Sequence, residues 1–161
     1  MATVHLGLGT NIGNKKENLT RAIEALSLAL GPCTAQSTFI ETAPWGFDSD
    51  NAFLNCAVAF ETELPPQELL DTTERIEREL GRTTKSAGGI YHDRTIDIDI
   101  LLYGEEVMET PRLTIPHPLM HLRDFVLEPL EQIAPEVVHP TLKKSIHLLA
   151  TELGNADIQK G

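Results

Sequence analysis

The chain has few of the features that would place it in several large protein classes. It has only two cysteines, Cys33 and Cys56, and they show neither a CxxC nor a metal-ligand spacing. We therefore expect both to be free, reduced and buried. No apolar run approaches the roughly 18 residues of a membrane helix, and no basic-then-apolar leader opens the sequence. These features favour a cytoplasmic protein that does not enter a membrane.

Basic residues are also scarce. The 13 Lys and Arg residues face 24 Asp and Glu residues, which gives a net charge of −11. A broad face for nucleic acid or anionic membrane needs clustered Lys and Arg, so both partners are disfavoured. A few local arginines and a metal are still enough to bind one phosphorylated small molecule. The composition, 41% hydrophobic and 23% charged, is typical of a globular protein, and the length favours a single domain over residues 1–161.

The common nucleotide-binding signatures are missing as well. There is no Gly-x-x-x-x-Gly-Lys and no kinase catalytic-loop set. The Gly-x-Gly at residues 7–9 lacks the third glycine of a dinucleotide fingerprint, so we interpret Gly7 and Gly9 as close-packing and turn positions. Any nucleotide chemistry must therefore rest on another arrangement of residues.

The most informative stretch is RTIDIDILLY at residues 94–103, which predicts a strand because apolar and polar residues alternate. The isoleucines at 96, 98 and 100 would face a core, while Thr95, Asp97, Asp99 and Leu101 share the other face. Two carboxylates two residues apart on a strand lie about 6.5–7 Å apart at their Cα atoms. Their repulsion suits a hard cation such as Mg²⁺. The alternative is a strand whose polar face is simply wet.

The order of the remaining elements predicts the fold. We expect strands over 3–9, 34–42 and 53–62 and a central strand over 94–103, with helices over 15–30 and 66–80 between them. Asn14 is the expected N-cap of the first helix, in a capping box with Glu17. Short strands over 107–109 and 112–115, a short helix over 121–130 and a last helix over 142–153 follow. This order is ferredoxin-like, an α+β fold with a mostly antiparallel sheet and helices on both sides, in three αβα layers.

Cations and aromatic residues lie near the 94–103 strand or in segments that could return to it. The cations are Arg82, Lys85, Arg94 and Arg123, and His117 lies between two prolines. Metal-bridged phosphates flanked by arginines are typical of phosphoryl-type transfer. The aromatic residues Phe53, Phe125 and Trp45 could wall a pocket for a flat polar heterocycle, with Thr42 and Asn55 at its edge.

Each of these residues also has a purely structural interpretation. The aromatic rings could be plain core, His117 a hydrogen-bonded structural residue, and Arg82 a cation that complements a helix C-terminus. Glu77 lies near that same helix C-terminus, where a carboxylate is disfavoured, so it needs a partner or a role unless it is simply solvated.

These blocks together resemble the 6-hydroxymethyl-7,8-dihydropterin pyrophosphokinases of folate biosynthesis. The most specific blocks are RTIDIDI at 94–100 and LTIPHP at 113–118, supported by LGTNIG at 8–13, ETAP at 41–44, FLN at 53–55, IE at 76–77, LGR at 80–82 and IAP at 133–135. The resemblance implies a diphosphotransferase that moves the β,γ-diphosphate of ATP to the hydroxymethyl oxygen of the pterin and releases AMP. It also implies two Mg²⁺ ions, with ATP as co-substrate.

The resemblance further implies a role for each matching residue. The implied catalytic residues are Arg82, Arg94, Asp97 and Asp99, of which the two aspartates are also the metal ligands. The implied ATP-binding residues are Glu77, Lys85, Arg94, Ile100, Thr114, His117 and Arg123. The implied pterin-binding residues are Thr42, Ala43, Pro44, Trp45, Phe53, Asn55, Asp97 and Phe125. Tyr91-His92-Asp93 and Thr84 depart from the family's usual loop, in which Trp-Gly-Pro and a second arginine are common; Lys85 could supply part of the missing charge.

Two other function classes stay open at this point. An RNA-binding domain of similar strand order would carry aromatic and basic residues on its central strand, where this chain has Asp97 and Asp99. A non-catalytic relative that binds ATP and Mg²⁺ as a sensor is disfavoured by the intact aspartates, the arginines and His117. ATP-dependent AMP formation in the presence of the pterin separates an enzyme from a sensor.

The sequence has no long exposed apolar stripe, so we expect a monomer. The partners that the resemblance implies are the small molecules ATP and the pterin.

Overall fold

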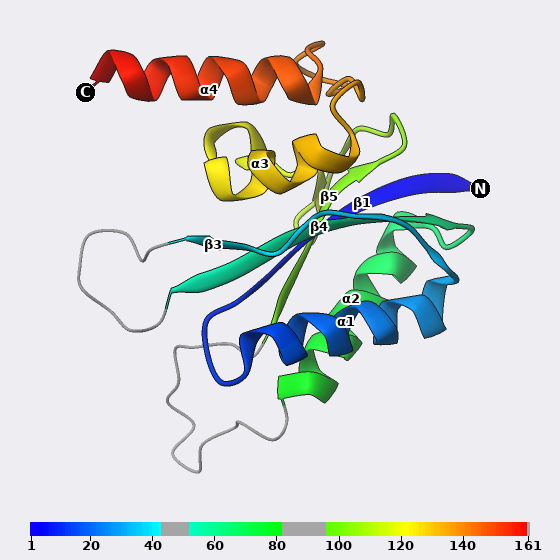
Figure 1. The fold of residues 1–161 in the computed structure, drawn as a ribbon. Helices are drawn as coiled ribbons and strands as arrows, with labels where there is room; N and C mark the ends of the chain where they lie inside the picture. The colour runs from blue at the N-terminus through cyan, green and yellow to red at the C-terminus, as the bar shows by residue number, and fades with distance from the viewer. Residues whose placement is uncertain (43–51, 82–95, 161) are drawn as a thin grey trace.

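The computed structural model describes residues 1–42, 52–81 and 96–160 (Figure 1). The strands are β1 (Ala2–Thr10), β2 (Cys33–Gln36), β3 (Ile40–Thr42), β4 (Phe53–Thr62), β5 (Asp97–Tyr103), β6 (Met108–Glu109) and β7 (Thr114–Ile115). The helices are α1 (Lys15–Leu30), α2 (Pro66–Gly81), the 3-10 helix η2 (Met120–Leu122), α3 (Asp124–Ile133) and α4 (Ile146–Lys160). The order of these elements confirms the predicted ferredoxin-like succession.

The main sheet is antiparallel, with strand order β2-β4-β1-β5 and with β3 also paired to β4. Strands β6 and β7 form a separate hairpin. The strand with the two aspartates was predicted to be central, and this was wrong: within the described residues β5 pairs only with β1 and lies at the sheet edge. Alternation along a strand reports which of its faces is buried, but it does not report whether both of its edges are paired.

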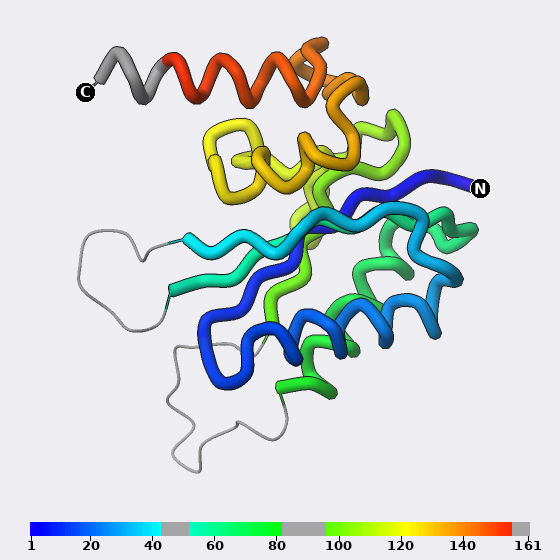
Figure 2. Tube along the Cα trace, viewed as in Figure 1, coloured from blue at the N-terminus to red at the C-terminus, as the bar shows by residue number. Residues whose placement is uncertain are grey.

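Helices cover both faces of this sheet, which confirms the three αβα layers. Helices α1 and α2 lie side by side on one face, and α3 covers the other face with α4 stacked over it (Figures 1 and 2). The core under α1 and α2 takes the side chains Val4, Leu6, Leu8, Leu26, Val58, Phe60, Ile76 and Ile98. The core under α3 and α4 includes Ala57, Leu101, Leu102, Met120, Leu127, Leu130, Ile146 and Leu149.

The first helix begins and ends where the sequence predicts. The Asn14 Oδ1 atom accepts a hydrogen bond from the Glu17 N–H at 3.2 Å, so Asn14 is the N-cap. The Glu17 carboxylate pairs with Arg21 one turn later. Gly31 ends the helix with a positive φ of 111°, a conformation that favours glycine.

The predicted strand over 34–42 is split into β2 and β3. Ser37, between them, is buried, and it exchanges two hydrogen bonds with Ala57: its N–H donates to the Ala57 carbonyl and its Oγ accepts from the Ala57 N–H, each at 2.9 Å. The N–H of Thr38 donates to the Gln132 side chain of α3 at 2.8 Å. These tertiary contacts replace regular pairing along residues 37–39, and the strand pattern does not encode them.

The C-terminal boundaries also differ from the prediction. The 112–115 strand shortens to β7, the 107–109 strand to β6, and the 121–130 helix becomes η2 followed by α3. The last helix begins at Ile146 instead of 142, because a loop closes before it: the His139 Nδ1 atom accepts from the N–H groups of Thr141 and Leu142 at 3.2 and 3.0 Å. Val138 and Ser145 bridge the ends of this loop.

Two further expectations concern cysteines and membranes. Both cysteines are free, and Cys56 is buried, but Cys33 is only half-buried, so burial was predicted correctly for one of the two. Across the described parts of the chain, no helix combines the length and the apolarity that a membrane crossing requires.

Candidate active site

Three neighbouring strands bring the predicted site residues to one end of the sheet. Gly9 of β1 pairs with Asn55 of β4 on one side and with Asp97 of β5 on the other. Gly7 is likewise paired with Asp99. Residues directly paired on antiparallel strands point to the same face. The two aspartates and Asn55 therefore share the face opposite to α1 and α2, with only glycine between Asn55 and Asp97.

The side chains of β5 alternate as the sequence predicts. Ile96, just before the strand, and Ile98 and Ile100 within it are 2%, 4% and 4% exposed and lie in the core under α1 and α2. Asp97 is half-buried and Asp99 is exposed. Both aspartates thus lie on the face away from that core, beyond the part covered by α3 and α4.

The donor set around these aspartates fits a hard cation that keeps other oxygen ligands. Over residues 1–42, 52–81 and 96–160, no group of three or more His, Cys, Asp or Glu side chains is arranged to hold a metal. A structural zinc site needs such a closed set, whereas Mg²⁺ is held by one or two carboxylates plus water and substrate phosphates. Asp97 and Asp99 match the second pattern.

Glu77 of α2 forms a hydrogen bond with the backbone of β5, the strand that carries the two aspartates. Its Oε2 atom accepts a hydrogen bond from the Ile98 N–H at 2.8 Å. Ile98 lies between the two aspartates, and an edge strand leaves part of its backbone donors without a ladder partner. The Glu77 carboxylate accepts a hydrogen bond from one of these donors. This bond gives Glu77 the partner that we expected for a carboxylate near a helix C-terminus.

His117 is fixed beside β5 by one main-chain and one side-chain hydrogen bond. Its N–H donates to the Leu101 carbonyl of β5 at 3.0 Å, and its Nδ1 atom accepts from the Leu119 N–H at 3.2 Å. A neutral ring with an accepting Nδ1 carries its proton on Nε2. Burial lowers the pKa of His117; Asp99 opposes this shift and the Arg123 charge adds to it. His117, Asp99 and Arg123 therefore lie within electrostatic reach of one another.

Arg123 also contacts one of the two candidate aromatic walls. Its guanidinium carbon lies 5.6 Å from the centre of the Phe125 ring, within the range of a cation–π contact. Phe125 and Phe53 are each 36% exposed. Both rings therefore reach the surface, which argues against the interpretation that they are plain core residues.

Asn55 is the buried polar residue of the site. Its side chain is only 6% exposed, and its Nδ2 atom donates to the Thr42 hydroxyl at 3.1 Å. Thr42 ends β3 and pairs with Phe53 in the sheet. The structure thus brings these three predicted pterin-binding residues together, next to Gly9 and Asp97.

Other predicted site residues are placed elsewhere or fall outside the described residues. Ile100 is in the core, so only its main chain and a small part of its side chain are available to a ligand. Thr114 lies in β7, half-buried and paired with Glu109. Outside the described residues are Ala43, Pro44, Trp45, Arg82, Lys85 and Arg94.

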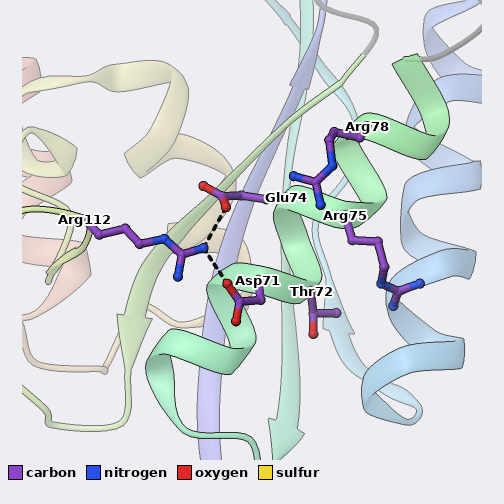
Figure 3. Close-up of a pocket in the computed structure, with 6 residues that line it drawn as sticks. All are labelled: Asp71, Thr72, Glu74, Arg75, Arg78 and Arg112. Atoms are coloured by element: carbon purple, nitrogen blue, oxygen red, sulfur yellow. Dashed lines mark hydrogen bonds and ion pairs between the residues drawn. The ribbon is translucent and has the colours of Figure 1, made fainter.

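Sequence reasoning missed a cavity of about 380 Å³ beside α2. Arg112, from the connection between β6 and β7, reaches across it and donates to the carboxylates of Asp71 and Glu74 (Figure 3). The full lining is Asp71, Thr72, Glu74, Arg75, Arg78 and Arg112. A signal was present: residues 71, 74, 75 and 78 follow the spacing of one helix face, and all four are charged.

Known proteins are similar to this chain in sequence and in fold. The model of the 7,8-dihydro-6-hydroxymethylpterin-pyrophosphokinase (HPPK) family matches residues 5–135, which include every described site residue above. The chain belongs to this family. A 2-amino-4-hydroxy-6-hydroxymethyldihydropteridine pyrophosphokinase of Porphyromonas gingivalis is 51% identical over 141 residues, which cover 87% of this chain and 95% of that protein.

Two longer proteins contain an HPPK-like part. The "Folic acid synthesis protein FOL1" of Dictyostelium discoideum is 38% identical over 154 residues, which cover 94% of this chain but 22% of that protein. A crystal structure of Plasmodium falciparum HPPK-DHPS with pteroate superposes with a TM-score of 0.74 at 18% identity, over 94% of this chain and 42% of that one. At this identity the structural likeness supports the fold alone.

Proposed function

We propose that this chain transfers the β,γ-diphosphate of ATP to the hydroxymethyl oxygen of 6-hydroxymethyl-7,8-dihydropterin and releases AMP, as a step of folate synthesis. The pyrophosphokinase activity follows from membership of the HPPK family and from the pyrophosphokinase and folic acid synthesis names of its relatives. One observation carries the assignment to this face: the aspartates lie between a buried amide with an aromatic neighbour on one side and a histidine–arginine pair on the other.

The pterin end of the site is proposed at Asn55, Thr42 and Phe53. A pterin is a flat heterocycle with donors and acceptors along one edge, so it needs an apolar wall and a fixed polar side chain. Phe53 supplies exposed ring surface, and Asn55 is fixed by its hydrogen bond to Thr42. Phe125 is proposed as the second wall. On the resemblance of sequence alone, we propose that the pterin also contacts Ala43, Pro44 and Trp45.

The phosphates are proposed to lie near His117 and Arg123. Both side chains can donate to phosphate oxygens. Arg123 donates through its guanidinium, and His117 through Nε2, which carries the ring proton because Nδ1 accepts from the Leu119 N–H. Arg82, Lys85 and Arg94 are proposed to add positive charge from the segment that precedes β5. This charge is needed most while the diphosphate is between its donor and acceptor oxygens.

The nucleoside end is proposed at the α2 side of β5, where Glu77, Ile100 and Thr114 were predicted to contact ATP. The cavity next to Arg112 is close to this place, because Arg112 precedes Thr114 by two residues and Glu74 precedes Glu77 by less than one helical turn. We propose that it receives the sugar or base of the nucleotide.

Asp97 and Asp99 are proposed to hold two Mg²⁺ ions together with the phosphates. When bound, the metal neutralises phosphate charge and orients the chain of phosphates. Asp97 is the closer of the two aspartates to the pterin end, because Gly9 alone separates it from Asn55 in the sheet. We therefore propose that Asp97 orients the hydroxymethyl group. The new bond joins that oxygen to the β-phosphorus, the bond between the β-phosphorus and the α-phosphate oxygen breaks, and the hydroxyl proton leaves.

The test is the product formed from ATP, Mg²⁺ and the pterin, with and without EDTA. We expect AMP that depends on both the pterin and Mg²⁺; ADP would mean monophosphoryl transfer, and no turnover by the folded protein would favour a nucleotide sensor. Asp97→Asn and Asp99→Asn should abolish AMP release without unfolding the chain. Glu24→Gln, an exposed carboxylate of α1 beyond the opposite face, is the matched control. Normal turnover by either aspartate variant would contradict the metal assignment.

We also propose that the protein acts as a monomer in the cytoplasm. Its large exposed hydrophobic residues are scattered over several elements, as with Leu28 on α1, Val107 before β6 and Leu148 on α4. The free thiols of Cys33 and Cys56 suit a reducing compartment. Size-exclusion chromatography with light scattering tests the oligomeric state.

A further inference from the structure

Gly9 lies where a side chain would collide with the pterin end of the site. A Cβ atom built on Gly9 would be 2.7 Å from the Asn55 Oδ1 atom and 3.9 Å from Cδ1 of Phe53. Real Cβ atoms essentially never approach a heavy atom to less than 3.0 Å. The amide of Asn55 therefore occupies the space that any other residue at position 9 would fill.

The backbone gives no separate reason for this glycine. Gly9 is paired on both sides within the sheet and is not among the glycines with positive φ, which in the described residues are Gly13, Gly31 and Gly104. A glycine inside a strand weakens it by roughly 0.5–1 kcal/mol relative to alanine. What Gly9 provides is space above its Cα atom.

Gly7, two residues earlier on the same face, is different. The three atoms nearest to a Cβ atom there all belong to the Leu101 side chain, the closest at 3.3 Å. A contact at this distance requires the neighbour to shift by only a few tenths of an ångström, whereas the 2.7 Å contact at Gly9 requires a larger displacement. The Asn55 amide at Gly9 has less freedom, because its Nδ2 atom is bonded to Thr42 and its side chain is buried.

We propose that Gly9 is a positioning residue that sets the orientation of the Asn55 amide for the pterin. This inference rests on the proposed function, because it assumes that Asn55 binds the heterocycle. Thr42 fixes the amide from the nitrogen side, and the bare Cα of Gly9 leaves the place that its oxygen occupies. A methyl group at Gly9 would push Oδ1 away and rotate the amide against Thr42, so its hydrogen bonds to the pterin edge would lengthen or bend.

The experiment combines Gly9→Ala, Asn55→Ala and the double variant, with Gly7→Ala as the matched control. We expect Gly9→Ala to raise KM for the pterin about 10- to 100-fold, since a displacement of this kind costs up to about two orders of magnitude. KM for ATP should change less than about threefold, because the nearest atoms to the added methyl group belong to Asn55 and Phe53, at the pterin end. Gly7→Ala should change KM for the pterin less than about twofold, because the atoms nearest to its methyl group belong to Leu101 and not to the pterin end.

The double variant separates positioning from a general effect on the sheet. With alanine at position 55 there is no amide to displace, so adding Gly9→Ala should raise pterin KM no further than Asn55→Ala alone. Multiplicative effects of the two substitutions would overturn the proposal, as would a Gly9→Ala variant with wild-type pterin KM. Thermal melting of all four variants checks that each is folded.

Direct binding keeps this inference separate from the proposed activity. Titration with fluorescent 6-hydroxymethylpterin measures affinity without turnover, and the same loss is expected for Gly9→Ala. A wild-type protein that binds this pterin but releases no AMP would overturn the proposed activity and leave the Gly9 comparison intact. A wild-type protein that binds no pterin would overturn both.

Discussion

Replacing Glu77 by alanine should loosen the strand that carries both aspartates. The Glu77 carboxylate is bonded at 2.8 Å to the N–H of Ile98, which lies between Asp97 and Asp99 on an edge strand. Without it, this donor must find water, and within the described residues the strand pairing of β5 at this point is with β1. The perturbation is therefore local to the proposed metal site.

The magnitude follows from the type of bond. A hydrogen bond to a charged group contributes about 1.5–3 kcal/mol to the free energy of unfolding. This one is only partly buried, so the lower half of that range applies. For a chain of this size each kcal/mol lowers the melting temperature by roughly 2–4 °C, so Glu77→Ala should lower it by roughly 3–9 °C. Glu77→Gln keeps an accepting oxygen and, since a neutral bond is about half as strong, should lose about half as much.

Two measurements test this reasoning together. Thermal or urea unfolding gives the stability change, and amide hydrogen exchange at Ile98 reports the bond itself. We expect exchange at Ile98 to accelerate in Glu77→Ala and less in Glu77→Gln, and kcat to fall with it because the aspartates are less firmly spaced. A Glu77→Ala variant with the wild-type melting temperature and unchanged Ile98 protection would refute the anchoring role, even if its KM for ATP rose.

Three further perturbations probe other parts of the molecule. Burial lowers the pKa of His5 and of His139, and His121 adds to the shift at His139. Below the ordinary histidine pKa of about 6.5 the unfolded state therefore binds more protons than the folded state, so the urea midpoint should be constant above that pH and fall as the pH drops through it. A midpoint unchanged between about pH 7.5 and 5.5 would contradict this. Burial, with Cys33 nearby, raises the pKa of the Cys56 thiol to about 12; at pH 8 a thiol reagent should therefore modify Cys56 only after unfolding, and rapid labelling of the native protein would be inconsistent with this. Thr42→Val removes the hydrogen-bond partner of the Asn55 amide; it should cost about 1 kcal/mol of stability and raise pterin KM while leaving KM for ATP unchanged, which steady-state kinetics with each substrate varied can check.

The sequence predicts the core faces and the main elements because their signals are local. Alternation placed Ile96, Ile98 and Ile100 in the core and Asp97 and Asp99 opposite them, and the Asn14 cap fixed the start of α1. What it could not supply depends on contacts between distant segments. The edge position of β5 follows from which strand pairs with β1, and the break between β2 and β3 follows from the bonds that Ser37 makes with Ala57.

The same distinction applies to the candidate site. The resemblance supplied residue types, but the nearness of Asn55 to Asp97 depends on the register of β4, β1 and β5 around Gly9. The contact of Arg123 with Phe125 and the bond from Ile98 to Glu77 likewise depend on side-chain placement that the sequence pattern does not encode. Gly9 was predicted only as a packing or turn position, since its reason is the volume taken by a side chain 46 positions later in the sequence.

The edge position of β5 supports the proposal that one pair of carboxylates serves two different substrates. On its β1 side, glycines at positions 7 and 9 leave the surface bare toward Asn55. On its other side, β5 meets no further strand of the main sheet within the described residues, and its backbone there bonds to the Glu77 carboxylate and to the His117 N–H. A central strand would have a strand on each side of the aspartates. In the proposed site, an edge strand leaves one side for the pterin and the other for the phosphates, which would place the aspartates where the two substrates meet.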